Sequence, residues 1–267
     1  TQATTQVTKE PAEIASLVYN GQPQALVTAG ETNVGFLVYS LDGTNFSPEI
    51  PTGTNAGAYT VHYKVDGTAD YSEVTVKTVP VTIQPKAITP TVTPSTSSFL
   101  YDGTKKEPVI VLKDGKTVID EDQYTVAWTN DNDPTATDVL TDAGTYTATI
   151  ASVANGNYTF TATAKATITK AAQSALKITG KPSHVYYGDT VTTLDTTGGS
   201  GNGTVTWSIE TGGTSSVINP GTGELTVKDT GSITVKAERT VPNYETVSDT
   251  WTFTVEPKPV TAVVTVT

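Results

Sequence analysis

A six-residue stretch that recurs three times is the feature that most constrains the fold. It reads Asn-Ala-Gly-Ala-Tyr-Thr at 55–60, Asp-Ala-Gly-Thr-Tyr-Thr at 142–147 and Asp-Thr-Gly-Ser-Ile-Thr at 229–234. The central glycines stand at 57, 144 and 231, so both intervals are 87 residues by subtraction. A turn residue, then a glycine free to take positive φ, then a buried anchor predicts a corner leading into a strand. Its recurrence at one period predicts three tandem copies of one unit.

The anchor residue of each corner favours an immunoglobulin-like β-sandwich. In such sandwiches a corner tyrosine returns its hydroxyl to the backbone just upstream and fixes the loop. We expect this of Tyr59 and Tyr146, whereas Ile233 keeps the buried anchor and lacks the hydroxyl. The runs that follow the corners, 61–65, 148–150 and 235–237, alternate with a period of two, which predicts strands. The sequence therefore predicts an all-β chain with no helix.

Three further runs predict the middle strands of the units. They lie at 36–41, 124–128 and 204–209, and the first leads into a hairpin turn at 42–43. Each carries one large aromatic residue, Tyr39, Trp128 or Trp207, at the place where sandwich domains bury a ring between their sheets. In the third unit, residues 216–227 predict a further hairpin.

Landmarks with the same period set the unit boundaries. The tyrosines at 19, 101 and 186 open the units at spacings of 82 and 85 by subtraction, and Asx-Tyr pairs at 70–71, 157–158 and 243–244 precede each last strand. The predicted units are residues 1–86, 87–170 and 171–257, with 258–267 as a linker or the start of a further repeat. Short connections that carry proline predict a semi-rigid array. Strands of about ten residues at 3.3 Å each, plus end loops, predict a rod on the order of 110 Å.

Composition and charge exclude several functions. The chain carries 27 acidic and 16 basic residues, for a net charge of −11, which argues against nucleic acid and anionic membrane as partners. It has no cysteine, so packing rather than disulfides holds the units together, as in many exported bacterial modules. It has no methionine and begins at Thr1, from which we expect a segment of a longer precursor. Its two histidines, His62 and His184, leave almost no material for catalytic pairs or zinc sites.

The first unit resembles the MBG-type immunoglobulin-like repeats of bacterial surface proteins. The matching residues are Tyr-Asn-Gly-Gln at 19–22, the run 39–46, the corner 53–59 and the closing stretch 81–86. The second unit is similar but departs from the pattern at 130–134. The third is similar to generic bacterial Ig-like repeats at 205–208 and 219–227.

This resemblance covers nearly the whole chain and implies an extracellular segment at a bacterial cell surface. It implies use in cell adhesion or as a stalk, with the signal peptide and anchor outside this segment, and it implies no catalytic residue. We expect a monomer without direct membrane contact.

Acidic loops of the second unit are candidates for calcium binding. Asp120 and Asp122 precede one short strand, and Asp131 and Asp133, with Asp138 beyond, follow it. If the loops converged at one end of the sandwich, their oxygens would suit Ca²⁺. The alternative is that Asn and Asp clusters build turns and solvated loop tips. We expect no other cofactor.

Lysines on the strands raise the prospect of an intramolecular isopeptide bond. Lys64, Lys77 and Lys236 lie in predicted strands, and the bond requires a desolvated lysine beside an asparagine and a carboxylate. The alternative is lysine on solvated faces or edges.

Tyrosines of the chain are candidates for glycan binding. Tyr63, Tyr71, Tyr158 and Tyr244 could form a platform for a sugar, but the last three recur at one period, which is more typical of fold anchors.

The sequence thus predicts a non-enzymatic stalk or spacer of an adhesin. The alternatives are a module that binds host glycans, mucin or another surface protein, and accessory domains of a larger surface enzyme.

Overall fold

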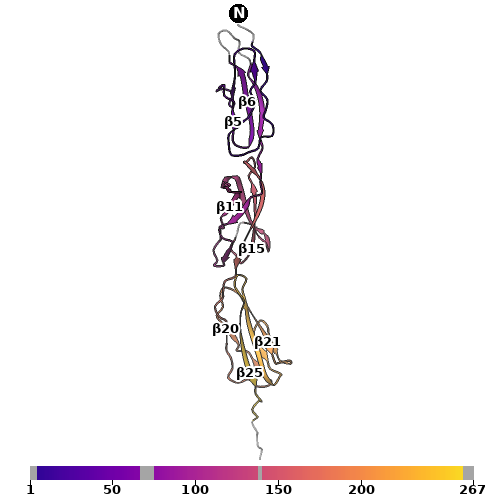
Figure 1. The fold of residues 1–267 in the computed structure, drawn as a ribbon. Helices are drawn as coiled ribbons and strands as arrows, with labels where there is room; N and C mark the ends of the chain where they lie inside the picture. Colours follow the sequence, from indigo (N-terminus) through magenta and orange to yellow (C-terminus); the bar gives the residue numbers. More distant parts are fainter. Residues whose placement is uncertain (1–4, 67–74, 138–139, 261–267) are drawn as a thin grey trace, which may run out of the picture.

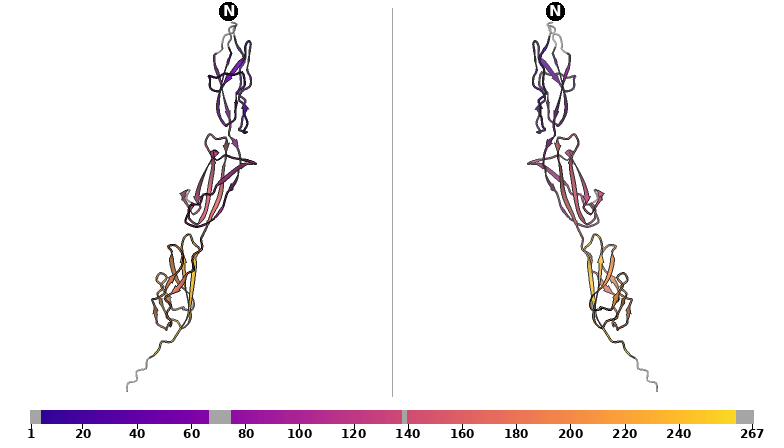
Figure 2. Two further views of the ribbon diagram at one scale, coloured as in Figure 1. Left: turned by 90° about the vertical axis from the view of Figure 1, so that its left-hand side faces the viewer. Right: turned by 90° about the vertical axis from the view of Figure 1, so that its right-hand side faces the viewer.

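Three β-sandwich units follow one another end to end in the computed structural model, which describes residues 5–66, 75–137 and 140–260 (Figure 1). Views from the two sides show the same extended arrangement (Figure 2). Within the described residues, regular secondary structure consists of strands and one short 3₁₀ turn. The prediction of an all-β chain of tandem Ig-like sandwiches in an extended array is confirmed.

The first unit packs one three-stranded sheet against two short strand pairs. The sheet has the order β4-β6-β7, and the pairs are β1-β3 and β2-β5. Alternate residues of β6 are buried in its second half, as a two-residue period requires of a strand with one face on the core. The strands are β1 (Val7–Lys9), β2 (Gln24–Ala25), β3 (Glu31–Thr32), β4 (Leu37–Ser40), β5 (Thr52–Gly53), β6 (Gly57–Val65) and β7 (Lys77–Ile83).

The second unit has the widest sheet of the molecule. Its five strands have the order β10-β17-β15-β13-β14, and they face a three-stranded sheet, β12-β11-β9. The elements are β9 (Thr91–Pro94), β10 (Ser98–Leu100), β11 (Ile110–Asp114), β12 (Thr117–Val118), η1 (Glu121–Gln123), β13 (Tyr124–Asn130), β14 (Asp133–Thr137), β15 (Gly144–Ser152) and β17 (Thr161–Thr169). Two further short strands, β8 (Lys86–Ala87) and β16 (Tyr158–Thr159), pair with each other where the first two units meet.

The third unit is built on the sheet β21-β24-β25, faced by β19-β23-β22 and the pair β18-β20. The predicted hairpin at 216–227 is present, because β22 and β23 pair in antiparallel register. The strands are β18 (Lys177–Thr179), β19 (Thr190–Val191), β20 (Asp195–Thr197), β21 (Thr204–Thr211), β22 (Val217–Ile218), β23 (Leu225–Thr226), β24 (Gly231–Thr240) and β25 (Val247–Val255).

Each unit has a hydrophobic core of its own. The buried residues fall into three separate clusters, one in each unit. The large aromatics predicted to lie between the sheets, Tyr39, Trp128 and Trp207, are all buried members of these clusters. Each unit is therefore stabilised by the burial of its own hydrophobic core.

The opening segment of every unit pairs in parallel with its last strand. The partners are Val18 with Gln84, Leu100 with Thr169, and Tyr186 with Glu256. This register corrects one part of the predicted alignment. The tyrosines whose N–H groups donate to the last strand are those at 19, 101 and 187, so Tyr187 and not Tyr186 is the third equivalent.

The corner glycines differ in their need for positive φ. Gly57 has a φ of 144° and Gly231 a φ of 90°, both in the region that favours glycine. Gly144 has no positive φ, and a Cβ added there would lie 3.7 Å from the Asn130 side chain, an ordinary contact. The expectation of a left-handed glycine at each corner is therefore wrong for the second unit.

No described segment forms a helix long and apolar enough to cross a membrane.

Candidate functional site: the junctions between units

The corners that define the repeat have the expected hydrogen bond in the first two units. The Tyr59 hydroxyl donates to the carbonyl of Asn55 at 2.8 Å, and the Tyr146 hydroxyl donates to the carbonyl of Asp142 at 2.8 Å. Ile233 takes this place in the third unit and is fully buried. In the first two units the bond uses only the main-chain oxygen of the corner, so it leaves the side chain of Asn55 or Asp142 free for another partner.

That partner is an asparagine of the next unit. Asn157, which precedes the last strand of the second unit, turns its amide onto the corner of the first unit. Its Oδ1 accepts from the Ala56 N–H at 2.8 Å, and its Nδ2 donates to Asn55 Oδ1 at 3.2 Å. Because a backbone N–H can only donate, it fixes which end of the amide is Oδ1. The main chain adds a third bond, from the Lys86 N–H to the Asn157 carbonyl at 2.9 Å.

The second junction repeats this contact group by group. Asn243 Oδ1 accepts from the Ala143 N–H at 2.8 Å, and Asn243 Nδ2 donates to Asp142 Oδ1 at 2.7 Å. The Ala171 N–H donates to the Asn243 carbonyl at 3.1 Å. One chemical difference separates the two junctions: the acceptor is an amide oxygen of Asn55 in the first and a carboxylate of Asp142 in the second.

A pair of tyrosines closes each junction beside the asparagine. Tyr19 meets Tyr158 edge to face, with ring centroids 5.3 Å apart and an interplanar angle of 78°. Tyr101 meets Tyr244 in the same way, at 5.4 Å and 76°. This geometry places the positive edge of one ring against the negative face of the other, a contact that stabilises by about 0.5–1.5 kcal/mol beyond the area buried.

Backbone pairing continues across each boundary. At the first junction, β8 pairs in parallel with β16, Lys86 opposite Tyr158. Lys86 also forms an ion pair with Asp114 of the second unit. At the second junction, Ala171 forms a parallel bridge with Tyr244. The connecting segment is thus hydrogen-bonded to the unit it enters, and such a joint restricts both bending and rotation.

The sequence placed the Asn157-Tyr158 and Asn243-Tyr244 pairs before the last strand of their units and indicated that their tyrosines are fold anchors; it did not predict their contacts with the preceding unit. One sequence signal could have separated a junction residue from a fold anchor. Two motifs repeat with the same period: an Asx residue at each corner, and an Asx-Tyr pair in the unit that follows. Because the corner of one unit binds the pair of the next, the two motifs are halves of one contact. The matching Asp70 and Tyr71 of the first unit lie outside the described residues.

The corner of the third unit is held in another way. The Asp229 carboxylate accepts hydrogen bonds from the Ser216 N–H and hydroxyl, both 2.6 Å from Oδ2, and from the Ser215 N–H at 2.9 Å from Oδ2. The Thr214 hydroxyl adds a contact to Oδ1 at 3.3 Å. These donors, the Ser216 hydroxyl first, hold the pKa of Asp229 below its ordinary value although desolvation acts against them.

The four predicted calcium ligands are not brought together. Asp120 and Asp122 lie before the first residue of β13 and Asp131 and Asp133 after its last, so the strand separates the two pairs. Each aspartate of the second pair has a protein partner: Asp131 binds Lys165 at 2.8 Å, and Asp133 binds the Thr135 hydroxyl at 2.6 Å. Within residues 5–66, 75–137 and 140–260, no three His, Cys, Asp or Glu side chains form a metal-binding group. Asp138 lies outside these ranges, and calcium binding stays a prediction without a site.

The lysines considered for an isopeptide bond have other contacts. Lys77 binds Glu10 at 2.6 Å, Lys236 binds Glu238 at 2.7 Å, and Lys64 lies over the Phe46 ring. The bonds from Lys77 and then from the Tyr63 hydroxyl lower the pKa of Glu10. These contacts match the alternative that the lysines lie on solvated faces.

The tyrosines considered for a glycan platform are occupied as well. Tyr63 is only 4% exposed, and its hydroxyl bonds to Glu10. Tyr158 and Tyr244 pack in the junctions, as the paired rings above show.

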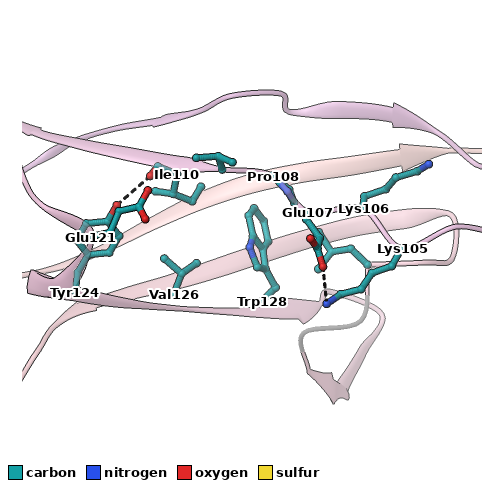
Figure 3. Close-up of a pocket in the computed structure, with 11 residues that line it drawn as sticks. Lys105, Lys106, Glu107, Pro108, Ile110, Glu121, Tyr124, Val126 and Trp128 are labelled. Atoms are coloured by element: carbon teal, nitrogen blue, oxygen red, sulfur yellow. Dashed lines mark hydrogen bonds and ion pairs between the residues drawn. The ribbon is translucent and has the colours of Figure 1, made fainter.

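A cleft opens in the second unit along β13 (Figure 3). It has a volume of about 400 Å³, with Tyr124, Val126 and Trp128 on one side and the segment 105–110 on the other. Trp128 is only 7% exposed, so little of its ring is accessible from the cleft. Lys105 and Glu107 pair at 3.1 Å on the rim. Its volume exceeds the roughly 250 Å³ of a second cleft, which is lined by residues 56–58, 82–83, 85 and 155–156.

Comparisons with known proteins identify other tandem arrays. Neither a protein-family model nor a curated protein sequence matches the chain. Solved structures that are similar include mouse cadherin-23 EC22–24, which is 16% identical with a TM-score of 0.28. The match covers 94% of this chain and 100% of that one. Drosophila N-cadherin EC1–4 is 10% identical with a TM-score of 0.27, over 95% of this chain and 76% of that one. Protocadherin gamma B2 extracellular domains 3–6 are 13% identical with a TM-score of 0.29, over 95% and 73%. Similarity at this level says nothing about ligand or activity.

Proposed function

We propose that this segment is a non-enzymatic spacer that holds another part of an extracellular surface protein away from its point of attachment. The observation that carries the proposal is the repeated junction. Two boundaries that differ in local sequence are held by the same three contacts. These are a pair of hydrogen bonds between one asparagine amide and the preceding corner, which we call the fork, an edge-to-face tyrosine pair, and backbone pairing that continues across the boundary. A flexible linker would need none of these contacts. Placement on a bacterial surface, in the stalk of an adhesin, rests on the sequence resemblance alone.

Small-angle scattering of the whole segment tests the spacer. A stiff array gives a maximum dimension on the order of 110 Å, whereas a folded-back particle of this size gives about 60 Å. The double variant Asn157→Ala/Asn243→Ala removes both forks and leaves the cores intact, so we expect a broader distribution of interunit distances. Asn219→Ala, in a turn of the third unit away from both junctions, is the matched control. A compact particle for the unchanged chain would rule out the spacer.

A second candidate function is binding of a glycan in the cleft of the second unit. It is favoured by the size of the cleft and by the presence of both aromatic residues and a charged pair in its lining. A mucin and glycan array, read with Ca²⁺ and with chelator, tests it. The variant Lys105→Ala/Glu107→Ala should abolish saturable binding, and Lys9→Ala/Glu31→Ala, which removes an exposed ion pair of the first unit, should not. Binding that is absent in both conditions would remove this candidate.

A further inference from the structure

The far end of the third unit presents most of the groups that form the two junctions, without a partner. The parallel ladder and the corners give the equivalences. Thr230 stands where Ala56 and Ala143 stand, one residue before the corner glycine. Lys258 stands where Lys86 and Ala171 stand, three residues after the strand residue that faces that glycine. Within the described residues, the N–H groups of Thr230 and Lys258 have no hydrogen-bond acceptor.

The tyrosine of this end is also exposed. Tyr187 is equivalent by register to Tyr19 and Tyr101, whose rings are half-buried against the next unit. The Tyr187 side chain is 53% exposed, among the most exposed large hydrophobic residues of the chain. Within residues 5–66, 75–137 and 140–260 the Tyr187 ring pairs with no other aromatic ring, so it is available as one half of an edge-to-face pair.

We infer that this end of the third unit is a docking site for another Ig-like unit that carries an Asn-Tyr loop. The occupant follows from continuity with the two existing interfaces. An incoming asparagine Oδ1 accepts from the Thr230 N–H, its carbonyl accepts from the Lys258 N–H, and the tyrosine after it packs on Tyr187. The inference deepens the proposed spacer function, on which it rests, because it names what the array itself can bind.

This site differs from the other two in one group. The Asp229 oxygens already accept five contacts from Thr214, Ser215 and Ser216, whereas a carboxylate offers about four lone-pair positions. No acceptor is left for the Nδ2 of the incoming amide. The fork is therefore reduced to a single hydrogen bond, and the third joint is looser than the first two.

Tyrosine coupling measures all three joints in one molecule. A fourth unit, residues 87–170, is appended directly after Lys258, so that its Asn-Tyr loop follows in the register of the first junction. Visible light, a ruthenium tris-bipyridyl sensitiser and persulfate remove one electron and one proton from each of two tyrosines. The two radicals join through ring carbons, and the persulfate takes both electrons. Peptide mapping then identifies which rings were in contact.

We expect coupled peptides joining Tyr19 to Tyr158, Tyr101 to Tyr244, and Tyr187 to the tyrosine of the appended loop, the last in lower yield. Changing the appended asparagine to alanine should lower the Tyr187 yield several-fold and leave the other two unchanged. Tyr186, one residue earlier and stacked on His184, is the internal control and should not couple. A second fusion, with residues 172–257 after Lys258, repeats the test with the other native loop.

The outcomes are distinguishable. If both fusions couple the first two pairs but not Tyr187, or couple Tyr186 equally well, the docking site is wrong and the spacer stands. If the first two pairs also fail to couple, the junctions do not form in solution, and the spacer falls with the inference.

Discussion

The corners of the first two units and the corner of the third unit hold the same turn by different means. In the first two, a tyrosine hydroxyl binds the main-chain oxygen of the corner residue. The side chain of Asn55 or Asp142 is then free to bind the amide of the next unit. In the third, the anchor is Ile233, which has no hydroxyl, and the Asp229 side chain binds the neighbouring Ser215 and Ser216.

The comparison teaches that one side chain cannot stabilise the corner and also form the joint. The tyrosine hydroxyl does the first task in the first two units, so the Asx residue can do the second. Where the hydroxyl is missing, the Asx residue is used locally and the joint loses an acceptor. The corner tyrosine is therefore a residue of the junction as well as of the fold, although it does not touch the neighbouring unit's asparagine.

The largest effect is expected from changing the amide that forms the fork. In Asn243→Asp the new carboxylate has no N–H to donate and faces the Asp142 carboxylate, so the hydrogen bond becomes a repulsion. We expect the second junction to lose about 2 kcal/mol, counting about 1 kcal/mol for the bond and as much for the like charges. Spin-label distance distributions across the junction should broaden, and more so at low salt.

Asn157→Asp is the matched test at the first junction. There the facing group is the amide of Asn55, which can turn to present Nδ2 to the new carboxylate. The fork is then preserved with the donor and acceptor exchanged, and the distance distribution should stay narrow. Equal broadening at both junctions would contradict the assigned hydrogen bonds.

The next effect is expected at the corner tyrosine itself. Tyr146 is 1% exposed, and in Tyr146→Phe the Asp142 carbonyl loses its hydroxyl donor, at a cost of about 1 kcal/mol. The amides of the second unit should exchange faster with solvent, and the second junction should loosen with them. Tyr59→Phe should cost less, since its hydrogen bond is solvent-exposed. Unchanged exchange in both variants would show that the hydroxyls do not hold the corners.

Much of the fold could be predicted from the sequence because the same pattern of strands and corners occurs in three copies. Alternating runs, the corner tyrosines and the buried aromatics each follow from positions within one unit. The joint could not be predicted in the same way, because it depends on which residue of one unit meets which residue of the next. The Asn157 side chain contacts Asn55, which lies 102 positions away in the sequence, and no local sequence pattern predicts a contact over that separation.

Two limits of the sequence analysis have the same physical origin. Tyr186 was preferred to Tyr187 because spacing alone cannot choose between adjacent tyrosines, and the parallel ladder is what selects one. The calcium hypothesis depended on Asp120 and Asp131 converging at one end of the sandwich, but β13 runs between them. A strand of seven residues spans roughly 20 Å at 3.3 Å each, which keeps its two flanking loops apart.

A smaller effect is expected where the paired rings are changed. Tyr101→Leu removes the edge-to-face contact with Tyr244 and should weaken the second junction by about 0.5–1.5 kcal/mol, toward the lower end because leucine still buries apolar area. Tyr187→Leu removes the equivalent ring where no partner is present and should change nothing in the segment alone. The two variants, compared by residual dipolar couplings between units, separate the role in the joint from any role in the fold. A loss of order in the third unit on Tyr187→Leu would contradict its assignment as a joint residue.

The smallest effect concerns pH and distinguishes the third corner from the others. The Ser216 hydroxyl, together with the backbone N–H groups beside it, holds the pKa of Asp229 below its ordinary value. A lowered folded-state pKa means that the carboxylate stabilises the corner above the ordinary carboxyl range and that this contribution is lost as the pH falls through the folded value. The protection of the amides of 214–216 and 229–231, measured against their intrinsic exchange rates at each pH, should therefore fall at acid pH. Ser216→Ala removes the leading hydrogen bond, so the onset should move to higher pH, whereas the corner at 55–57, which is held by the Tyr59 hydroxyl and not by a carboxylate, should not follow. A common onset at both corners would show that the third corner does not depend on the Asp229 carboxylate.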